Sequence, residues 1–204
     1  MTVKAAKLLV LPCIRIFCLI VGLSACSSLP ERVKLPALAG EQEALYDIAG
    51  WLLDGRIAIK INGESWQASL TWNHTRTQDK LRLSGPLGVG AVDIYMSGHF
   101  MRLVHSDGEV ETSYNSDSLL KERLGFPVPL KDLQYWVLGL PSLESSKHQV
   151  VETYESGRTK TMIQSGWRII YKDFRQVGQW VLPKKIIAVR DTARLVLVAD
   201  DWVL

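Results

Sequence analysis

Apolar and polar residues alternate along much of the chain from residue 56 onwards. Ile57, Ile59 and Ile61 alternate with polar or small residues, and the Asn62-Gly63 pair that follows is typical of a two-residue hairpin turn. After that turn, the apolar side chains of residues 66–72 again occupy every second position. The pattern therefore predicts two antiparallel strands that share one apolar face.

The same period continues in short segments separated by turn residues. Asp107-Gly108, Ser156-Gly157 and Ser165-Gly166 mark further turns. The other predicted strands are residues 81–84, 90–96, 101–105, 109–114, 149–154, 159–164, 167–171, 180–190 and 194–203. Because residues 195–199 are all apolar, we expect the last strand to be covered on both faces. The chain thus predicts about eleven strands, joined mostly by short turns and therefore antiparallel.

A helical period interrupts the strands in the middle of the chain. Asn115 or Ser116 can cap a helix that Gly125 ends. Pro129 opens a second helix, whose apolar positions recur at helical spacing: Leu130, Leu133, Trp136 and Val137. A short helix is also predicted over residues 41–48. The sum is a mainly β (α+β) fold, in which a curved sheet or an open, incomplete antiparallel β-barrel has its mouth filled by helices.

The N-terminal segment has the pattern of a secretory leader. Residues 1–25 contain Lys4, Lys7 and Arg15 and no acidic residue, and residues 16–22 form an apolar run that is much too short to span a bilayer. A permanent membrane helix is therefore the weaker interpretation. Leu23-Ser24-Ala25-Cys26 then matches the lipobox of bacterial lipoprotein precursors. We predict that residues 1–25 are a cleaved signal peptide and that Cys26 carries S-diacylglyceryl and N-acyl groups; the alternative is that Cys26 is merely an apolar residue near the leader's end.

Cleavage before Cys26 changes the composition of the mature chain. Cys13 and Cys18 leave with the leader, so no free thiol and no disulfide are expected to remain. Three of the 24 basic residues also leave, and the 21 that remain equal the 21 acidic residues. Without a basic excess, nothing recommends nucleic acid as a partner.

The residues after Cys26 predict how the protein is placed in the cell. Two or more acyl chains anchor a protein stably on a membrane. Ser27 is not the aspartate that retains lipoproteins at the inner membrane of enterobacteria, so we expect an outer-membrane protein that faces the periplasm. Residues 26–40 contain Pro30 and Pro36 and predict an acylated, flexible tether. Residues 41–204 then form a single domain.

Candidate catalytic chemistry is scarce in the sequence. The four histidines show no metal-ligand spacing, and no nucleophile elbow or dinucleotide fingerprint is present. Asp200 and Asp201 are adjacent on a predicted strand, so their side chains point to opposite faces and are better explained as a solvated strand end. We therefore expect no enzymatic activity, no metal and no cofactor.

Two features have both an ordinary and a functional interpretation. The seven tryptophans, which include Trp72 and Trp136, either fill a β core or partly line an apolar cavity between sheet and helices. Pro86 and Leu87 lie in the predicted turn Gly85-Pro86-Leu87-Gly88, and a single exposed leucine at a loop tip is common. On a membrane-tethered protein, however, the same leucine would gain about 1.5–3 kcal/mol by entering the acyl region.

The ordered set of motifs resembles the LolB family of outer-membrane lipoprotein receptors. The matching segments run over nearly the whole mature chain: the lipobox, Gly55-Arg56, Trp72, Pro86-Leu87-Gly88, residues 133–141, Gln164-Ser165-Gly166-Trp167, Tyr171, Leu182-Pro183 and Trp202. The most specific is Trp136-Val137-Leu138-Gly139-Leu140-Pro141, whereas Pro-Leu-Gly alone would be weak. Arg15 within the leader departs from the pattern and affects only the bounds of the apolar run.

The resemblance implies an open barrel of eleven antiparallel strands with a helical lid over an apolar cavity. It also implies that the protein accepts acylated lipoproteins from the soluble periplasmic carrier LolA and inserts them into the outer-membrane bilayer. In that family the loop leucine is needed for insertion, which corresponds to Leu87 between Pro86 and Gly88. Trp72 and Trp136 are the candidates for the cavity wall, and nothing in the sequence suggests more than a monomer.

Two other classes compete with the receptor. The soluble carrier is thought to share the fold but should lack a lipobox, so Cys26 argues against it. An envelope scaffold or assembly lipoprotein would use its β surface and need no lipid-chain cavity. The scaffold is the alternative that the sequence leaves open.

Overall fold

A computed structural model describes residues 40–86, 90–124, 128–145 and 147–204. The three helices of these ranges are α2 (Glu41–Tyr46), α3 (Ser116–Leu124) and α4 (Leu130–Trp136). The eleven strands are β1 (Gly50–Ile61), β2 (Glu64–Thr75), β3 (Asp79–Ser84), β4 (Val92–Ser97), β5 (Phe100–His105), β6 (Val110–Ser113), β7 (His148–Thr153), β8 (Thr159–Gln164), β9 (Trp167–Val177), β10 (Trp180–Arg190) and β11 (Ala193–Val203). None of the described helices is long and apolar enough to cross a membrane.

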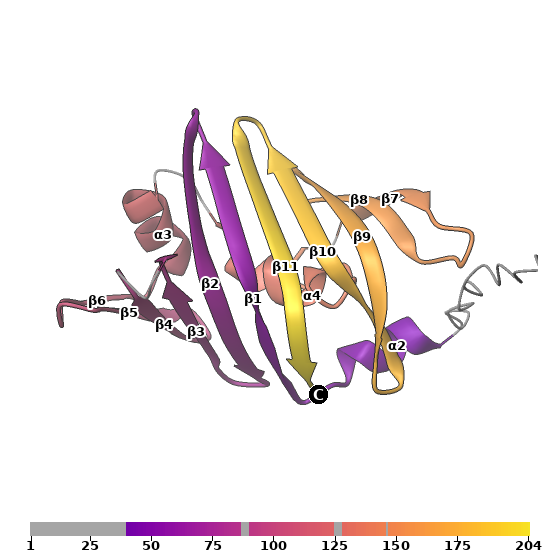
Figure 1. The fold of residues 1–204 in the computed structure, drawn as a ribbon, viewed down its shortest axis with the longest axis horizontal. Coiled ribbons are helices and arrows are strands. Elements are labelled where there is room, and N and C mark those ends of the chain that lie inside the picture. Colours follow the sequence, from indigo (N-terminus) through magenta and orange to yellow (C-terminus); the bar gives the residue numbers. More distant parts are fainter. Residues whose placement is uncertain (1–39, 87–89, 125–127, 146) are drawn as a thin grey trace, which may run out of the picture. The chain divides into compact units, whose positions relative to one another are not determined.

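All eleven strands belong to one antiparallel sheet. Their order is β6-β5-β4-β3-β2-β1-β11-β10-β9-β8-β7, so the first and the last strand of the chain pair in the middle (Figure 1). The edge strands β6 and β7 do not pair with each other, and the sheet is therefore open. The predicted mainly β fold, with about eleven antiparallel strands in an open arrangement, is confirmed.

Local turn chemistry explains the hairpins. Asn62 and Gly63 have φ angles of 48° and 93°, as a type I′ turn between twisted strands requires. Ser165 and Gly166, with φ angles of 53° and 77°, make the corresponding turn between β8 and β9. Asn115 caps α3, because its Oδ1 accepts a hydrogen bond from the backbone N–H of Ser118 at 3.1 Å. The predicted positions of these turns and of this cap are confirmed.

The contact between β1 and β11 depends on a glycine. The pairing register shifts between Asp54 and Gly55, where β11 carries one extra residue. A Cβ atom on Gly55 would lie 2.2 Å from the carbonyl oxygen of Val198, which no side chain tolerates. Gly55 therefore permits the closest approach of the two central strands.

The two faces of the sheet differ. The inner face packs against α3 and α4, and its side chains form the core together with Leu119, Leu133 and Trp136. In Figure 1, α4 lies behind the central strands, and α3 lies beside β2 on the side of β3 to β6. The opposite, outer face is turned toward the viewer. On β11, Leu195, Leu197 and Ala199 point inward and are buried, whereas Val196 and Val198 point outward and are only half-buried. The expectation that both faces of this strand are fully covered is therefore wrong for the outer face.

Candidate apolar ligand site

An apolar cavity of about 130 Å³ lies between the inner face of the sheet and the two middle helices. Strands β1 to β5 form its floor and wall, and α3 with the start of α4 forms its roof. The lining side chains are Ile57, Ile59, Trp66, Leu70, Trp72, Leu81, Leu83, Val92, Ile94, Leu103, His105, Leu120, Arg123, Val128, Leu130 and Leu133. Fourteen of these sixteen are apolar, because every second residue of each strand faces inward.

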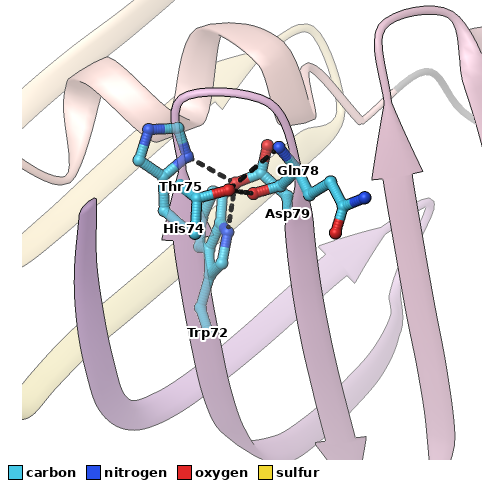
Figure 2. Close-up of polar contacts among 5 residues, drawn as sticks. All are labelled: Trp72, His74, Thr75, Gln78 and Asp79. Atoms are coloured by element: carbon cyan, nitrogen blue, oxygen red, sulfur yellow. Dashed lines mark hydrogen bonds and ion pairs between the residues drawn. The ribbon is translucent and has the colours of Figure 1, made fainter. Parts of the chain in front are cut away.

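Trp72 lines this cavity and is fully buried. Its indole Nε1–H donates a hydrogen bond of 2.8 Å to Oδ1 of Asp79, so the only polar atom of the ring is satisfied away from the cavity (Figure 2). The ring of Trp51 packs edge-on against it, with centroids 5.1 Å apart. Trp72 therefore presents a fixed apolar surface to the cavity.

Asp79 is held in place by its neighbours on the β2–β3 hairpin. The same Oδ1 accepts a second hydrogen bond of 2.7 Å from Nδ1 of His74, which lies directly opposite Asp79 in the strand register (Figure 2). The turn between them is closed by Thr75 and Gln78, whose backbone and side-chain groups exchange hydrogen bonds of 2.8–3.1 Å. The carboxylate thus has two donors and orients Trp72.

A cluster of hydrogen-bonded polar residues borders the cavity. Glu111 on β6 accepts a hydrogen bond of 2.9 Å from Nε2 of His105 on β5 and one of 2.6 Å from Nε of Arg123 on α3. His105 and Arg123 also line the cavity. Burial by itself raises the pKa of Glu111, but the hydrogen bonds from His105 and Arg123 outweigh it and leave the pKa below its ordinary value. This Glu111 cluster ties α3 to the edge of the sheet.

Trp136 is fully buried in the adjoining core and is not among the residues that line the 130 Å³ cavity. Its Nε1–H donates a hydrogen bond of 2.9 Å to Oε1 of Gln164 on β8. The same amide bonds both backbone groups of Ser142, at 2.8 Å each. Gln164 therefore fastens the segment around Trp136 to the sheet, and a positive φ of 82° at Gly139 lets this segment turn after α4.

The remaining predicted site residues are not brought into this cavity. Cys26, Leu87 and Gly88 lie outside the residues that the structure describes. Pro86 is exposed and borders a shallow groove on the outer face, together with Arg56, Val196 and Val198. The loop that contains Pro86 thus begins beside the outer face.

Sequence reasoning missed the polar residues that support the site. Asp79, Glu111 and Gln164 all occupy inward-facing positions, where alternation leads one to expect apolar side chains. A polar residue at an inward-facing position needs a hydrogen-bond partner, so its presence in the alternating pattern could have indicated a supporting role. Their partners lie on other elements, which the sequence alone does not place.

A second hollow of about 440 Å³ lies beside α2 and the β2–β3 turn. Its wall includes charged groups of both signs: Arg76, Asp79, Lys131 and Glu144. A wall of this kind suits water and polar groups rather than a hydrocarbon chain. In the described part of the chain, no group of three or more His, Cys, Asp or Glu residues is placed to hold a metal ion.

Fold and site together define an open antiparallel half-barrel with an apolar chamber under a helical roof. The family model described as "Outer membrane lipoprotein LolB" matches residues 49–202. The chain therefore belongs to the LolB family of outer-membrane lipoproteins.

Individual relatives agree with this assignment. The chain is 35% identical over 164 residues to an outer-membrane lipoprotein LolB of Nitrosococcus oceani, covering 80% of this chain and 81% of the relative. It is 30% identical over 199 residues to that of Cellvibrio japonicus, covering 93% and 98%. Among solved structures, a LolA superfamily protein from Nitrosomonas europaea shares a TM-score of 0.44 and 10% identity over 75% of this chain and 86% of that one. The family assignment rests on the sequence matches.

Proposed function

We propose that this protein is the outer-membrane receptor that accepts acylated lipoproteins and inserts them into the outer membrane. The observation that carries the proposal is the apolar cavity under α3 and α4 in a chain of the LolB family. The donor is the soluble periplasmic carrier LolA, and the receptor acts as a monomer, without an enzymatic step or a cofactor. An envelope scaffold, the competing interpretation, has no use for such a cavity and is not favoured.

The physical reason for a cavity is the cost of exposing acyl chains. A chain of ~15 methylenes costs on the order of 12 kcal/mol to expose to water, at about 0.8 kcal/mol per CH₂. A lipoprotein therefore needs an apolar site at every stage between two membranes. Transfer then requires only that each acceptor bind the chains better than the previous donor, and the bilayer is the final acceptor.

The cavity has to widen before it can hold such a chain. Its volume of about 130 Å³ is close to that of an engineered cavity of about 150 Å³ that accepts benzene. An acyl chain of ~15 methylenes has more than twice as many carbon atoms as benzene, so it does not fit in the cavity as it stands. We infer that α3 moves away from β5 and β6, which requires that the Glu111 cluster separate.

Anchoring and tethering belong to the same proposal. Residues 1–25 are the signal peptide, Cys26 is the acylated residue, residues 26–40 are the tether, and residues 41–204 are the receptor domain. Such an arrangement keeps the domain at the membrane that it serves, because several acyl chains give stable anchoring.

The loop Pro86-Leu87-Gly88 is proposed to enter the bilayer during insertion. Placing one leucine in the acyl region is worth about 1.5–3 kcal/mol, enough to hold the cavity near the membrane but not to anchor the protein by itself. Pro86 is exposed at the start of this loop, as the proposal requires.

A transfer assay tests the proposal. LolA loaded with an acylated lipoprotein is mixed with this protein in a Cys26→Ala form without the leader, and liposomes of uncharged lipid are added afterwards. We expect the lipoprotein to move first onto the receptor and then into the liposomes. If none moves onto the protein, the receptor function is excluded and the scaffold becomes the better interpretation.

Matched leucine variants separate the two steps. Leu87→Glu is expected to accept the lipoprotein normally and to lose most of the second step, because a carboxylate in place of the leucine resists entry into the acyl region. Leu143→Glu, at a position where the leucine is 67% exposed, is the control and is expected to complete both steps. Equal behaviour of the two variants would contradict the role of the loop.

A further inference from the structure

The basic side chains on the outer face of the sheet fall in two rows, on either side of a third row that has none. Neighbouring strands are in register, so outward-facing residues that oppose one another form lines across the strands. The first line is Ser69, Arg56, Val198, Lys185 and Lys172; the second is Gln67, Ala58, Val196, Ile187 and Ile170; the third is Ser65, Lys60, Arg194, Val189 and Arg168. A row that is apolar except for Gln67 thus lies between two rows with three basic residues each, and none of the three contains an acidic residue. We call these the apolar row and the basic rows.

Two pairs of basic residues on this face are directly opposed. Lys60 on β1 faces Arg194 on β11, and Lys185 on β10 faces Lys172 on β9. Like charges directly opposite each other destabilise an antiparallel pair. Arg56 is neutralised by Asp200, at 2.8 Å. In contrast, the four opposed residues of these two pairs, and Arg168, have no acidic partner in the described part of the chain. An external anion would remove this repulsion.

The size of the outer face suits a flat ligand rather than a single small molecule. Strands β2, β1, β11, β10 and β9 are neighbours about 4.8 Å apart, so the rows are about 19 Å long. The two basic rows are four residues apart along each strand, which is about 13 Å. Between them, Val196 and Ile170 are half-buried, and Ile187, which lies between these two in the row, is buried, so the apolar row offers a shallow surface rather than a deep groove.

We propose that this outer face lies against an anionic phospholipid surface, with the basic rows at the lipid phosphates and the apolar row between them. Charge complementarity supports this partner, because polybasic surfaces are attracted to anionic leaflets. The groove on the same face is bordered by Pro86, at the start of the proposed insertion loop. The choice of a bilayer rests on the proposed function, since a loop that enters the membrane brings this face close to the headgroups.

Depth-sensitive fluorescence tests the contact. The full chain, purified as the cell processes it, carries a fluorescent residue in place of Ser69 on the outer face or of Ser118 on α3, both exposed. It is reconstituted into vesicles of phosphatidylcholine, with or without phosphatidylglycerol, that contain a nitroxide on some headgroups. We expect several-fold stronger quenching at position 69 than at position 118 in anionic vesicles, and a loss of that difference at high salt.

Charge variants identify the side chains. The double variants Lys60→Glu/Arg194→Glu and Lys172→Glu/Lys185→Glu are each expected to abolish the quenching difference. Lys121→Glu/Lys147→Glu, at exposed positions outside the three rows, changes the charge equally and is expected to preserve it. Lys185→Glu alone places opposite charges face to face with Lys172, so it is expected to raise the unfolding midpoint while it weakens the contact. Because this variant is expected to be more stable than the wild type, misfolding cannot explain its weaker membrane contact.

Three outcomes would overturn the inference. The first is equal quenching at positions 69 and 118. The second is a quenching difference that is the same with and without phosphatidylglycerol. The third is that the double variants of the outer face retain the quenching difference of the wild type. If those variants instead slow only the transfer from LolA, the rows bind an acidic protein surface and the lipid inference is wrong. Transfer into uncharged liposomes tests the receptor function independently, so either proposal can fail without the other.

Discussion

At the scale of single residues, a half-buried carboxylate and a buried amide fix the two tryptophans that the sequence pattern selected. Asp79 orients Trp72, and Gln164 orients Trp136, each through a hydrogen bond to the indole nitrogen. A buried polar group that loses its partner costs more than the bond itself contributes. These residues therefore matter for stability although neither is apolar.

Replacing Gln164 by alanine is expected to destabilise the protein strongly. The side chain is 1% exposed, and its loss leaves the Trp136 N–H and both backbone groups of Ser142 without their partner. At about 1–3 kcal/mol for each orphaned group, partly relieved by relaxation, we expect a loss of about 3 kcal/mol in the free energy of unfolding. Urea denaturation measures it. Gln149→Ala, on the exposed edge strand β7, should change stability by less than about 0.5 kcal/mol. Equal losses would contradict the role of Gln164.

At the scale of elements, the seam between β1 and β11 depends on Gly55. A methyl group at this position meets the Val198 carbonyl oxygen at 2.2 Å, so Gly55→Ala forces the two central strands apart. We expect a loss of at least about 2 kcal/mol, because overpacking at a rigid backbone contact cannot be relieved by a side-chain rotation. The thermal midpoint reports it, and a variant that unfolds at the wild-type temperature would refute this account.

The attachment of α3 is expected to depend on pH. The folded-state pKa of Glu111 is lowered, so its contribution is complete above the ordinary carboxyl pKa and is lost as the pH falls through the folded value. Glu111→Gln should therefore exchange the amide hydrogens of α3 faster than the wild type at neutral pH. As the pH falls through the lowered folded-state pKa of Glu111, the difference should shrink, because the wild-type carboxyl is then protonated as well.

An exposed carboxylate on the same helix provides the control for that measurement. Glu122 is exposed on α3, and Glu122→Gln should leave the exchange of α3 unchanged at either pH. If Glu122→Gln matched Glu111→Gln, the effect would come from the overall charge of the helix rather than from the Glu111 cluster.

The elements could be predicted from the sequence to a useful extent, and the reason is local. Asn62-Gly63 and Ser165-Gly166 specify their turns by residues adjacent in the chain, and alternation places the strands that they join. The start of β1 at Gly50 was missed, because two glycines and adjacent leucines in residues 50–55 hide the alternation. Its pairing with β11 joins residues more than 130 positions apart, and no local pattern encodes that partner.

The candidate site could be predicted only in part, for a related reason. Trp72 was selected because alternation puts it on the apolar face, and it does line the 130 Å³ cavity. The side chains that border or support the site, such as Arg123 and Asp79, depend on which elements meet in space. The roles proposed for Cys26 and Leu87 stay predictions, since both residues lie outside the described ranges.

At the scale of the whole molecule, binding of an acyl chain should stabilise the fold. A ligand that binds the folded state adds about 2.7 kcal/mol at 100 times its dissociation constant. A long-chain fatty acid is therefore expected to raise the thermal midpoint in a concentration-dependent manner, whereas acetate, which has the same headgroup and no chain, should not. If neither ligand shifted the midpoint, the cavity would not open to hydrocarbon.

The central pairing of β1 with β11 has a consequence for how the chain is made. Within the sheet, the two meanders, β1 to β6 and β7 to β11, meet along this seam, and β11 follows the ten other described strands in synthesis. A nascent chain that lacks residues 193–203 leaves the edges of β1 and β10 open, and unpaired edges invite pairing with other chains. Completing the sheet is therefore a late, long-range event, because β1 and β10 stay unpaired along these edges until β11 has been made.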